Sequence, residues 1–173
     1  MSGPPEGLPV RAEQVVIISF DGANDTALWQ RSRRLAAITG ARFTYFLSCV
    51  FLIAPDKRGI YRPPRGKPGR SNVGFAASSK DAAARLGQIW LARAEGHEIA
   101  SHGCGHFDGA NWNEDDWLSE FGSFSTILRN AWRMNGAAGE PRDWHQFVEN
   151  EIRGFRAPYL STGRHRFSRT STT

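Results

Sequence analysis

Three short apolar segments have the composition of strands. Residues 15–20 (VVIISF) form a continuous β-branched run that stops at Asp21-Gly22, which predicts a buried parallel strand. Residues 43–53 (FTYFLSCVFLI) predict a second buried strand that runs into a loop, and residues 97–101 a short third one. Phe155 opens a further strand-like segment. Each predicted strand is separated from the next by a helical pattern or a long loop.

Three other segments have apolar residues at helical spacing, three and four positions apart. The first, residues 26–39, is predicted to end at Gly40 and to bury one face made of Leu28, Trp29, Leu35 and Ile38. The second, residues 79–94, begins with a serine cap at Ser79 and places its apolar side at Ala83, Leu86, Ile89, Trp90 and Ala94. The third, residues 113–134, has its apolar side at Trp117, Phe121, Phe124, Leu128 and Trp132.

Alternating strands and helices predict an α/β fold with a parallel sheet, either open or barrel-like, in which functional groups gather at the carboxyl ends of the strands. The segment between the second strand and the second helix, residues 54–74, is dense in Pro, Gly and Arg and is predicted to be a long surface loop that covers something. With 173 residues the chain fits one domain. We expect a flexible lead at residues 1–14, a domain at 15–163 and a disordered basic tail at 164–173.

Charge and apolar content narrow the class of protein. The chain carries a net charge of +5, and its cations cluster in loop-like stretches without the interleaved aromatic residues of a base-stacking platform. We therefore expect no nucleic-acid partner. No apolar run approaches about 18 residues and the N-terminus has no signal-peptide pattern, so we expect no membrane segment and a cytoplasmic location, or an extracytoplasmic one if the start of the sequence is misassigned. Cys49 and Cys104 are predicted to be free thiols.

Polar clusters follow three of the predicted strands: DGAND at residues 21–25, HGCGH at 102–106 and RGFRAPY at 153–159. Two imidazoles four positions apart can bind one metal ion when they share a compact loop. Structural histidines are the alternative, but glycines between the two favour close approach of backbone and ligand. A catalytic metal needs three protein ligands and a water, and a further carboxylate to take the proton of that water. Asp21 and Asp25 are candidates to divide these two carboxylate roles.

The segments ISFDG (18–22), GHEIASHGCGH (96–106) and FRAPY (155–159) resemble, in order, the first three motifs of the polysaccharide deacetylases, the nodulation-protein-B-like carbohydrate esterases. The resemblance covers about residues 15–163. It implies a partial, distorted (β/α) barrel and a metal-dependent hydrolase that removes N-acetyl groups from an amino-sugar polysaccharide or oligosaccharide. The implied cofactor is Zn²⁺ or another divalent cation such as Co²⁺ or Mn²⁺.

The resemblance also implies a role for each matching residue. Asp21 is the expected general base, Arg156 holds it, and the backbone N–H of Tyr159 binds the oxyanion. The expected metal ligands are His102 and His106. Arg156 has a plainer alternative, a surface arginine before a turn.

The sequence departs from the family pattern in two places. The family has two adjacent aspartates in its first motif, but Gly22 follows Asp21 here, so Asp25 is the nearest substitute ligand. Asn24 or a water is the alternative in that position, and a helix N-cap is the alternative role of Asp25. The chain also stops before the later family motifs and reads as truncated. His165, in the tail, is a poor candidate for the missing general acid.

Other interpretations follow from the truncation and the charge. A catalytically inactive remnant that binds metal or carbohydrate is the main alternative, and an incomplete barrel is expected to leave exposed strand edges and apolar faces. A basic interaction module that uses residues 62–70, or a related enzyme for another linear or cyclic amide, is also open. Trp112, Trp117 and Trp132 are expected in the core, although one near the His loop is a candidate to pack on a sugar ring.

Overall fold

The computed structural model describes residues 14–162, and its centre is a three-stranded parallel sheet in the order β1-β2-β3. The strands are β1 (Ser19–Asp21), β2 (Thr44–Leu47) and β3 (Glu98–Ser101). Beyond β3, Phe155 continues the sheet through an isolated parallel bridge to Ser101. Because all these segments run the same way, their carboxyl ends meet at one edge of the sheet.

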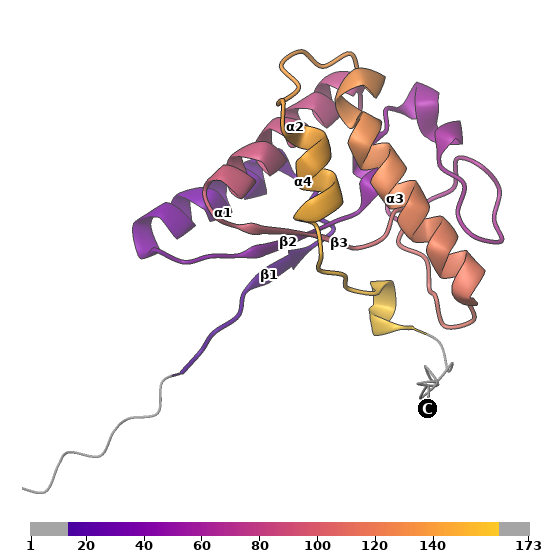
Figure 1. Cartoon of the computed structure of the whole chain (residues 1–173), viewed down its shortest axis with the longest axis horizontal. Helices are drawn as coiled ribbons and strands as arrows, with labels where there is room; N and C mark the ends of the chain where they lie inside the picture. The colour runs from indigo at the N-terminus through magenta and orange to yellow at the C-terminus, as the bar shows by residue number, and fades with distance from the viewer. Residues whose placement is uncertain (1–13, 163–173) are drawn as a thin grey trace, which may run out of the picture.

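Helices connect and cover the strands. They are α1 (Thr26–Thr39), α2 (Ser79–Ala94), α3 (Glu114–Met134) and α4 (Trp144–Asn150), with short 3₁₀ turns η1 (Cys49–Leu52), η2 (Pro55–Ile60) and η3 (Pro158–Leu160). Figure 1 shows the four helices gathered on one side of the three strands. The predicted parallel α/β arrangement is confirmed. The barrel stays a prediction, because the three strands and one bridge of residues 14–162 form an open sheet.

The predicted helix boundaries agree with the structure because the sequence supplies clear end signals. α1 stops at Gly40, which takes the left-handed conformation at φ 71°. Asn113 and Asp116 form a reciprocal capping box at the start of α3. The cap of α2 is Ser78, whose side chain accepts a hydrogen bond from Asp81 N at 3.1 Å, so the prediction of Ser79 was wrong by one residue.

The core lies between the sheet and the helices, and its buried aromatic residues come from several elements. Trp29 of α1 stacks on Tyr45 of β2 with ring centroids 4.0 Å apart. Trp144 of α4 is fully buried and packs at an angle on Trp132 of α3. The predicted core positions Trp112 and Trp132 are buried, whereas Trp117 is only partly so.

Two predicted apolar faces are exposed. The run at residues 15–18 was predicted to be a buried strand, but it extends away from the body of the molecule (Figure 1), and Ile17 is 85% exposed. β2 pairs with one edge of β1, and within residues 14–162 no strand pairs with the other. The predicted buried face of α1 was right for Trp29 but wrong for Leu28, Leu35 and Ile38, which are exposed. The helix buries Trp29, stacked on Tyr45, together with Ala36. Exposed apolar faces were expected of an incomplete barrel.

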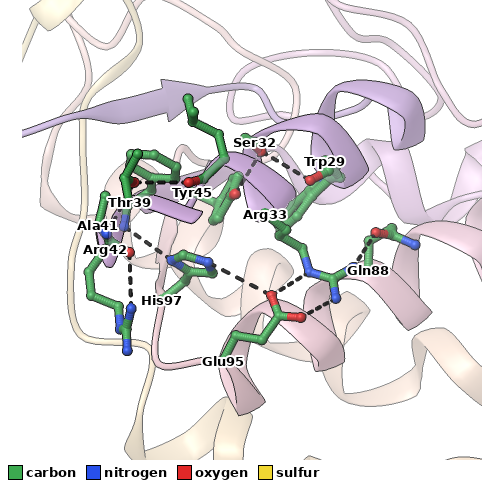
Figure 2. Close-up of polar contacts among 12 residues, drawn as sticks. Trp29, Ser32, Arg33, Thr39, Ala41, Arg42, Tyr45, Gln88, Glu95 and His97 are labelled. Atoms are coloured by element: carbon green, nitrogen blue, oxygen red, sulfur yellow. Dashed lines mark hydrogen bonds and ion pairs between the residues drawn. The ribbon is translucent and has the colours of Figure 1, made fainter. Parts of the chain in front are cut away.

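A polar cluster joins α1, α2 and β3 at the amino end of the strands (Figure 2). Arg33 of α1 donates from Nε to Glu95 Oε2 at 2.6 Å and from Nη1 to Gln88 at 2.8 Å. His97 lies beside Glu95, and its Nδ1 accepts a hydrogen bond from Phe43 N at 3.1 Å. These contacts fix the crossover helices against the sheet at the end opposite the candidate site.

None of the helices in the described part of the chain is long and apolar enough to cross a membrane. Two predicted segments lie outside the described residues. They are the lead at 1–14, of which only residue 14 is described, and the tail at 164–173, which contains His165.

Candidate functional site

A cavity of about 320 Å³ lies at the carboxyl edge of the sheet. Asp21, at the end of β1, shares it with His102 and His106 from the loop after β3. The rest of its lining is Gly22, Asn24, Phe51 and Val73. The parallel sheet thus brings together three predicted site residues that are up to 85 positions apart in the sequence.

Asp21 is held by Arg156 from the segment that bridges to β3. Nη1 of Arg156 donates a hydrogen bond to Oδ1 of Asp21 at 2.6 Å. The guanidinium also lies over the ring of Phe46, with Cζ 4.1 Å from the ring centroid, and the backbone of Arg156 is fixed by a bond from its N to Ser101 O at 3.0 Å. A charged, planar donor of this kind holds the carboxylate in one orientation.

His102 is buried, and one of its ring nitrogens already has a hydrogen-bond partner. Its Nδ1 lies 2.8 Å from the carbonyl oxygen of Arg156. A carbonyl oxygen only accepts hydrogen bonds, so Nδ1 carries the proton and Nε2 keeps a free lone pair. Burial lowers the pKa of His102 below its ordinary value, which favours the same neutral imidazole. Neutral imidazole with its second nitrogen bonded to a carbonyl is the usual state of a metal-binding histidine.

His106 has a left-handed backbone with φ 57°, which is uncommon outside glycine and indicates a locally constrained conformation. Its ring lies edge-on to that of His102, with centroids 4.9 Å apart, and at the same distance from the ring of Tyr159. Its carbonyl oxygen accepts a hydrogen bond from Asn72 Nδ2 at 3.0 Å. Asn72 belongs to the segment 54–74, which the sequence predicted to cover something without saying what, and which here contacts the His loop. The prediction that this segment is only a surface loop was wrong in part, since it contains η2 and the fully buried Tyr61.

Tyr159 lies next to this pair on η3. It has φ 57° and Leu160 has φ 54°, so two consecutive residues that are not glycine share the left-handed conformation. The side chain of Tyr159 is 59% exposed. The role of its backbone N–H as an oxyanion donor stays a prediction.

Asp25 has the role that was the alternative to metal binding. Its Oδ1 accepts hydrogen bonds from the backbone N–H groups of Ala27 at 2.7 Å and Leu28 at 3.2 Å, and so caps α1. Asp25 is not among the residues that line the cavity, whereas its neighbour Asn24 is. Nε of Arg85 donates to the carbonyl oxygen of Asn24 at 2.6 Å, which anchors this turn.

The donor set can be tested against the expected metal. Among residues 14–162, no group of three His, Cys, Asp or Glu side chains is arranged to hold an ion. The two imidazoles alone fit a divalent cation, and the third protein ligand expected of a catalytic zinc site is not formed by Asp25. Asn24 or water stays the alternative for that position, and metal binding by His102 and His106 stays a prediction.

The prediction of two free thiols was wrong. Cys49 and Cys104 form a disulfide with their Cα atoms 4.4 Å apart. Cys49 follows β2 and Cys104 follows β3, and because these strands are parallel neighbours their carboxyl ends bring the two residues together. The 55 positions between them in the sequence conceal this proximity.

Sequence reasoning also missed Phe51 and Val73 in the cavity wall, because both read as ordinary apolar residues.

No family model matches the chain, and no curated protein does. A solved structure, the Xyl-CE4 domain of a multidomain xylanase from the hindgut metagenome of Trinervitermes trinervoides, is similar at 17% sequence identity and a TM-score of 0.48. The similarity covers 86% of this chain and 50% of that chain, so this chain spans about half the length of the protein it matches. At this level the similarity assigns no function, which has to come from the residues of the cavity.

Proposed function

We propose that the chain carries the hydrolytic site of a carbohydrate deacetylase that removes N-acetyl groups from an amino-sugar polysaccharide or oligosaccharide. The observation that supports this most is the meeting of Asp21, held by Arg156, with two histidines in one cavity. An oriented carboxylate that can act as a base, beside two imidazoles that can bind a metal ion, is a set of groups able to activate water for hydrolysis of an amide. The order of the three sequence motifs adds the acetamide of an amino sugar as the substrate class.

Asp21 is the proposed general base. Its contact with Arg156 keeps the carboxylate oriented toward the cavity, where it takes a proton from the attacking water. The water oxygen bonds to the acetamide carbon, the C–N bond then breaks as the amine nitrogen takes up the proton that Asp21 accepted, and acetate and the sugar amine are released. We propose the backbone N–H of Tyr159 as a donor to the negative oxygen that forms during attack.

His102 and His106 are the proposed ligands of a divalent cation, Zn²⁺, Co²⁺ or Mn²⁺. A cation at this place supplies an acidified water and a Lewis acid for the acetamide oxygen. The carbonyl of Arg156 fixes the tautomer of His102, so the same arginine residue orients the base through its side chain and one ligand through its backbone.

One observation favours a second function, binding without turnover. Two imidazoles and a capped Asp25 give fewer protein ligands than a catalytic site usually has. A chain with this donor set is a candidate to hold a metal ion and a carbohydrate while turning over slowly or not at all.

The disulfide indicates the kind of compartment in which the protein acts on its substrate. Disulfides persist in oxidising compartments and are rare in the cytosol. The Cys49–Cys104 bond therefore favours the extracytoplasmic alternative over the cytoplasmic location expected from the sequence. Polymeric amino sugars of cell surfaces would be within reach there.

The test measures metal content and acetate release from N-acetylglucosamine oligomers, in the wild type and in a His102→Ala/His106→Ala variant. His145→Ala is the control, because this histidine is exposed and lies on α4, away from the residues that line the cavity. Loss of about one zinc per chain together with acetate release, in the double variant alone, supports the deacetylase. Bound metal without acetate release supports the binding function, and a wild type that binds none of Zn²⁺, Co²⁺ and Mn²⁺ contradicts both.

A further inference from the structure

A buried glutamate from α3 lies directly against the segment between the two histidines. Glu120 is 2% exposed, and its Oε1 accepts a hydrogen bond from the backbone N–H of Cys104 at 2.6 Å. Its Oε2 accepts another from the hydroxyl of Tyr61 at 2.9 Å. The carboxylate therefore reaches the centre of the His loop, residues 102–106.

Tyr61 completes the contact from the other side. It follows η2, is fully buried, and its hydroxyl oxygen accepts a hydrogen bond from Gly105 N at 3.1 Å while donating to Glu120. Two consecutive N–H groups of the His loop, those of Cys104 and Gly105, are thus tied to one carboxylate, the first directly and the second through the hydroxyl.

The two glycines of the HGCGH motif are explained by the same contact. A Cβ at Gly103 would lie 3.1 Å from Oε1 of Glu120, and φ at Gly103 is +70°. A Cβ at Gly105 would lie 2.7 Å from a ring carbon of Tyr61 and 2.5 Å from Phe107. The sequence pattern suggested that these glycines admit a ligand, but the groups that approach them are protein side chains.

The energetics separate this contact from ordinary core packing. The partners that Glu120 has in the described part of the chain are an amide and a hydroxyl, neither of them charged. Burial raises the pKa of Glu120, which reflects the free energy needed to keep a carboxylate away from water. Removing this carboxylate alone would leave the N–H of Cys104 and the hydroxyl of Tyr61 buried without an acceptor, so Glu120 is tied to these two contacts with the His loop.

We infer that Glu120 and Tyr61 are positioning residues that hold the backbone between His102 and His106, so that the two imidazoles face each other across one ligand position. This inference rests on the proposed binding of a divalent cation by the histidine pair. Neither residue is among those that line the cavity, so both act through the loop.

The test compares Tyr61→Phe with Tyr45→Phe. Both substitutions remove one buried hydroxyl that is hydrogen-bonded, to Glu120 in one case and to Ser32 at 2.7 Å in the other. We expect both to lower the thermal unfolding midpoint, but only Tyr61→Phe to weaken Zn²⁺ binding by about tenfold or more in calorimetric titration. Equal Zn²⁺ affinity in the two variants would overturn the inference.

A second measurement needs no metal. In the metal-free protein, NMR is expected to show a cross-relaxation contact between the imidazoles of His102 and His106, whose ring centroids are 4.9 Å apart. We expect this contact to be lost in Tyr61→Phe and in Gly105→Ala, and kept in Tyr45→Phe and in Gly122→Ala, where an added Cβ meets nothing within 4 Å.

If the wild type binds none of Zn²⁺, Co²⁺ and Mn²⁺, the proposed function fails, but the imidazole contact still tests whether Glu120 and Tyr61 position the histidines. Persistence of the contact in both His-loop variants would then show that Glu120 and Tyr61 do not position the histidines.

Discussion

Nη1 of Arg156 donates a hydrogen bond to Oδ1 of Asp21 at 2.6 Å, although the two residues are 135 positions apart in the sequence. The contact forms because Asp21 ends β1 while Arg156 follows the bridge of Phe155 to β3, at the same edge of the sheet. The guanidinium of Arg156 also stacks on the face of the Phe46 ring. The candidate base Asp21 is therefore oriented by a planar guanidinium, which is itself held by the ring of Phe46.

Replacing this cation with a more flexible one is expected to affect turnover more than binding. Arg156→Lys keeps the positive charge but loses the planar group that stacks on Phe46, so we expect kcat for acetate release to fall about 100-fold with a smaller change in KM. Arg153→Lys is the matched control, because Arg153 is exposed and donates to the carbonyl of Asn150. Equal kcat values in the two variants would remove Arg156 from the proposed mechanism.

Substitutions at Asp25 separate its capping role from the ligand role predicted by the sequence. Asparagine also caps helices, so Asp25→Asn is expected to retain stability, whereas Asp25→Ala should lose about 1 kcal/mol of unfolding free energy. We expect the Zn²⁺ affinity, measured by calorimetric titration, to be unchanged in Asp25→Asn. Urea unfolding measures the stability of both variants. A large loss of Zn²⁺ affinity in this variant, with stability intact, would restore Asp25 as a ligand.

The sequence predicted the elements well where local signals decide them. The ends of α1 and α3 are encoded by Gly40 and by the Asn113–Asp116 capping box, which act within one helical turn. The gathering of Asp21, His102 and Arg156 could also be predicted, because parallel strands place their carboxyl ends together.

The remaining features depend on tertiary contacts that a periodic pattern does not contain. The stacking of Trp29 on Tyr45 sets the buried side of α1, whereas Leu28, Leu35 and Ile38, which the apolar spacing placed on the same face as Trp29, are exposed. The pairing of Cys49 with Cys104 and the reach of Glu120 to the His loop depend on which elements are neighbours in space.

Loss of the disulfide is expected to destabilise the whole domain. It closes a loop with a sequence separation of 55 residues, for which the entropy of the unfolded chain predicts about 4 kcal/mol of stabilisation. Urea unfolding of a Cys49→Ala/Cys104→Ala variant should show a decrease of this order, and dithiothreitol should produce a similar decrease in the wild type. Dithiothreitol should leave the double variant unchanged, and an equal response of the two proteins would mean that the bond is not formed.

Stability should also fall at mildly acidic pH because of His97. Burial is the main cause that lowers the pKa of His97, and nearby Arg42 and Arg33 act in the same direction while Glu95 opposes them. Its Nδ1 accepts a hydrogen bond from Phe43 N, so the folded state needs the neutral ring. The unfolded chain, with an ordinary histidine pKa of about 6.5, binds the proton more readily. The contribution of His97 to the unfolding free energy is therefore complete above about pH 6.5 and declines as the pH falls toward the lowered folded-state pKa.

We expect His97→Asn, whose amide oxygen can replace the acceptor, to have a shallower dependence on pH between about 5 and 7 in urea unfolding. His145→Gln, at an exposed position on α4, should keep the wild-type slope. If instead His97→Asn keeps that slope, the acid sensitivity arises elsewhere, and the buried His102 is the next residue to test.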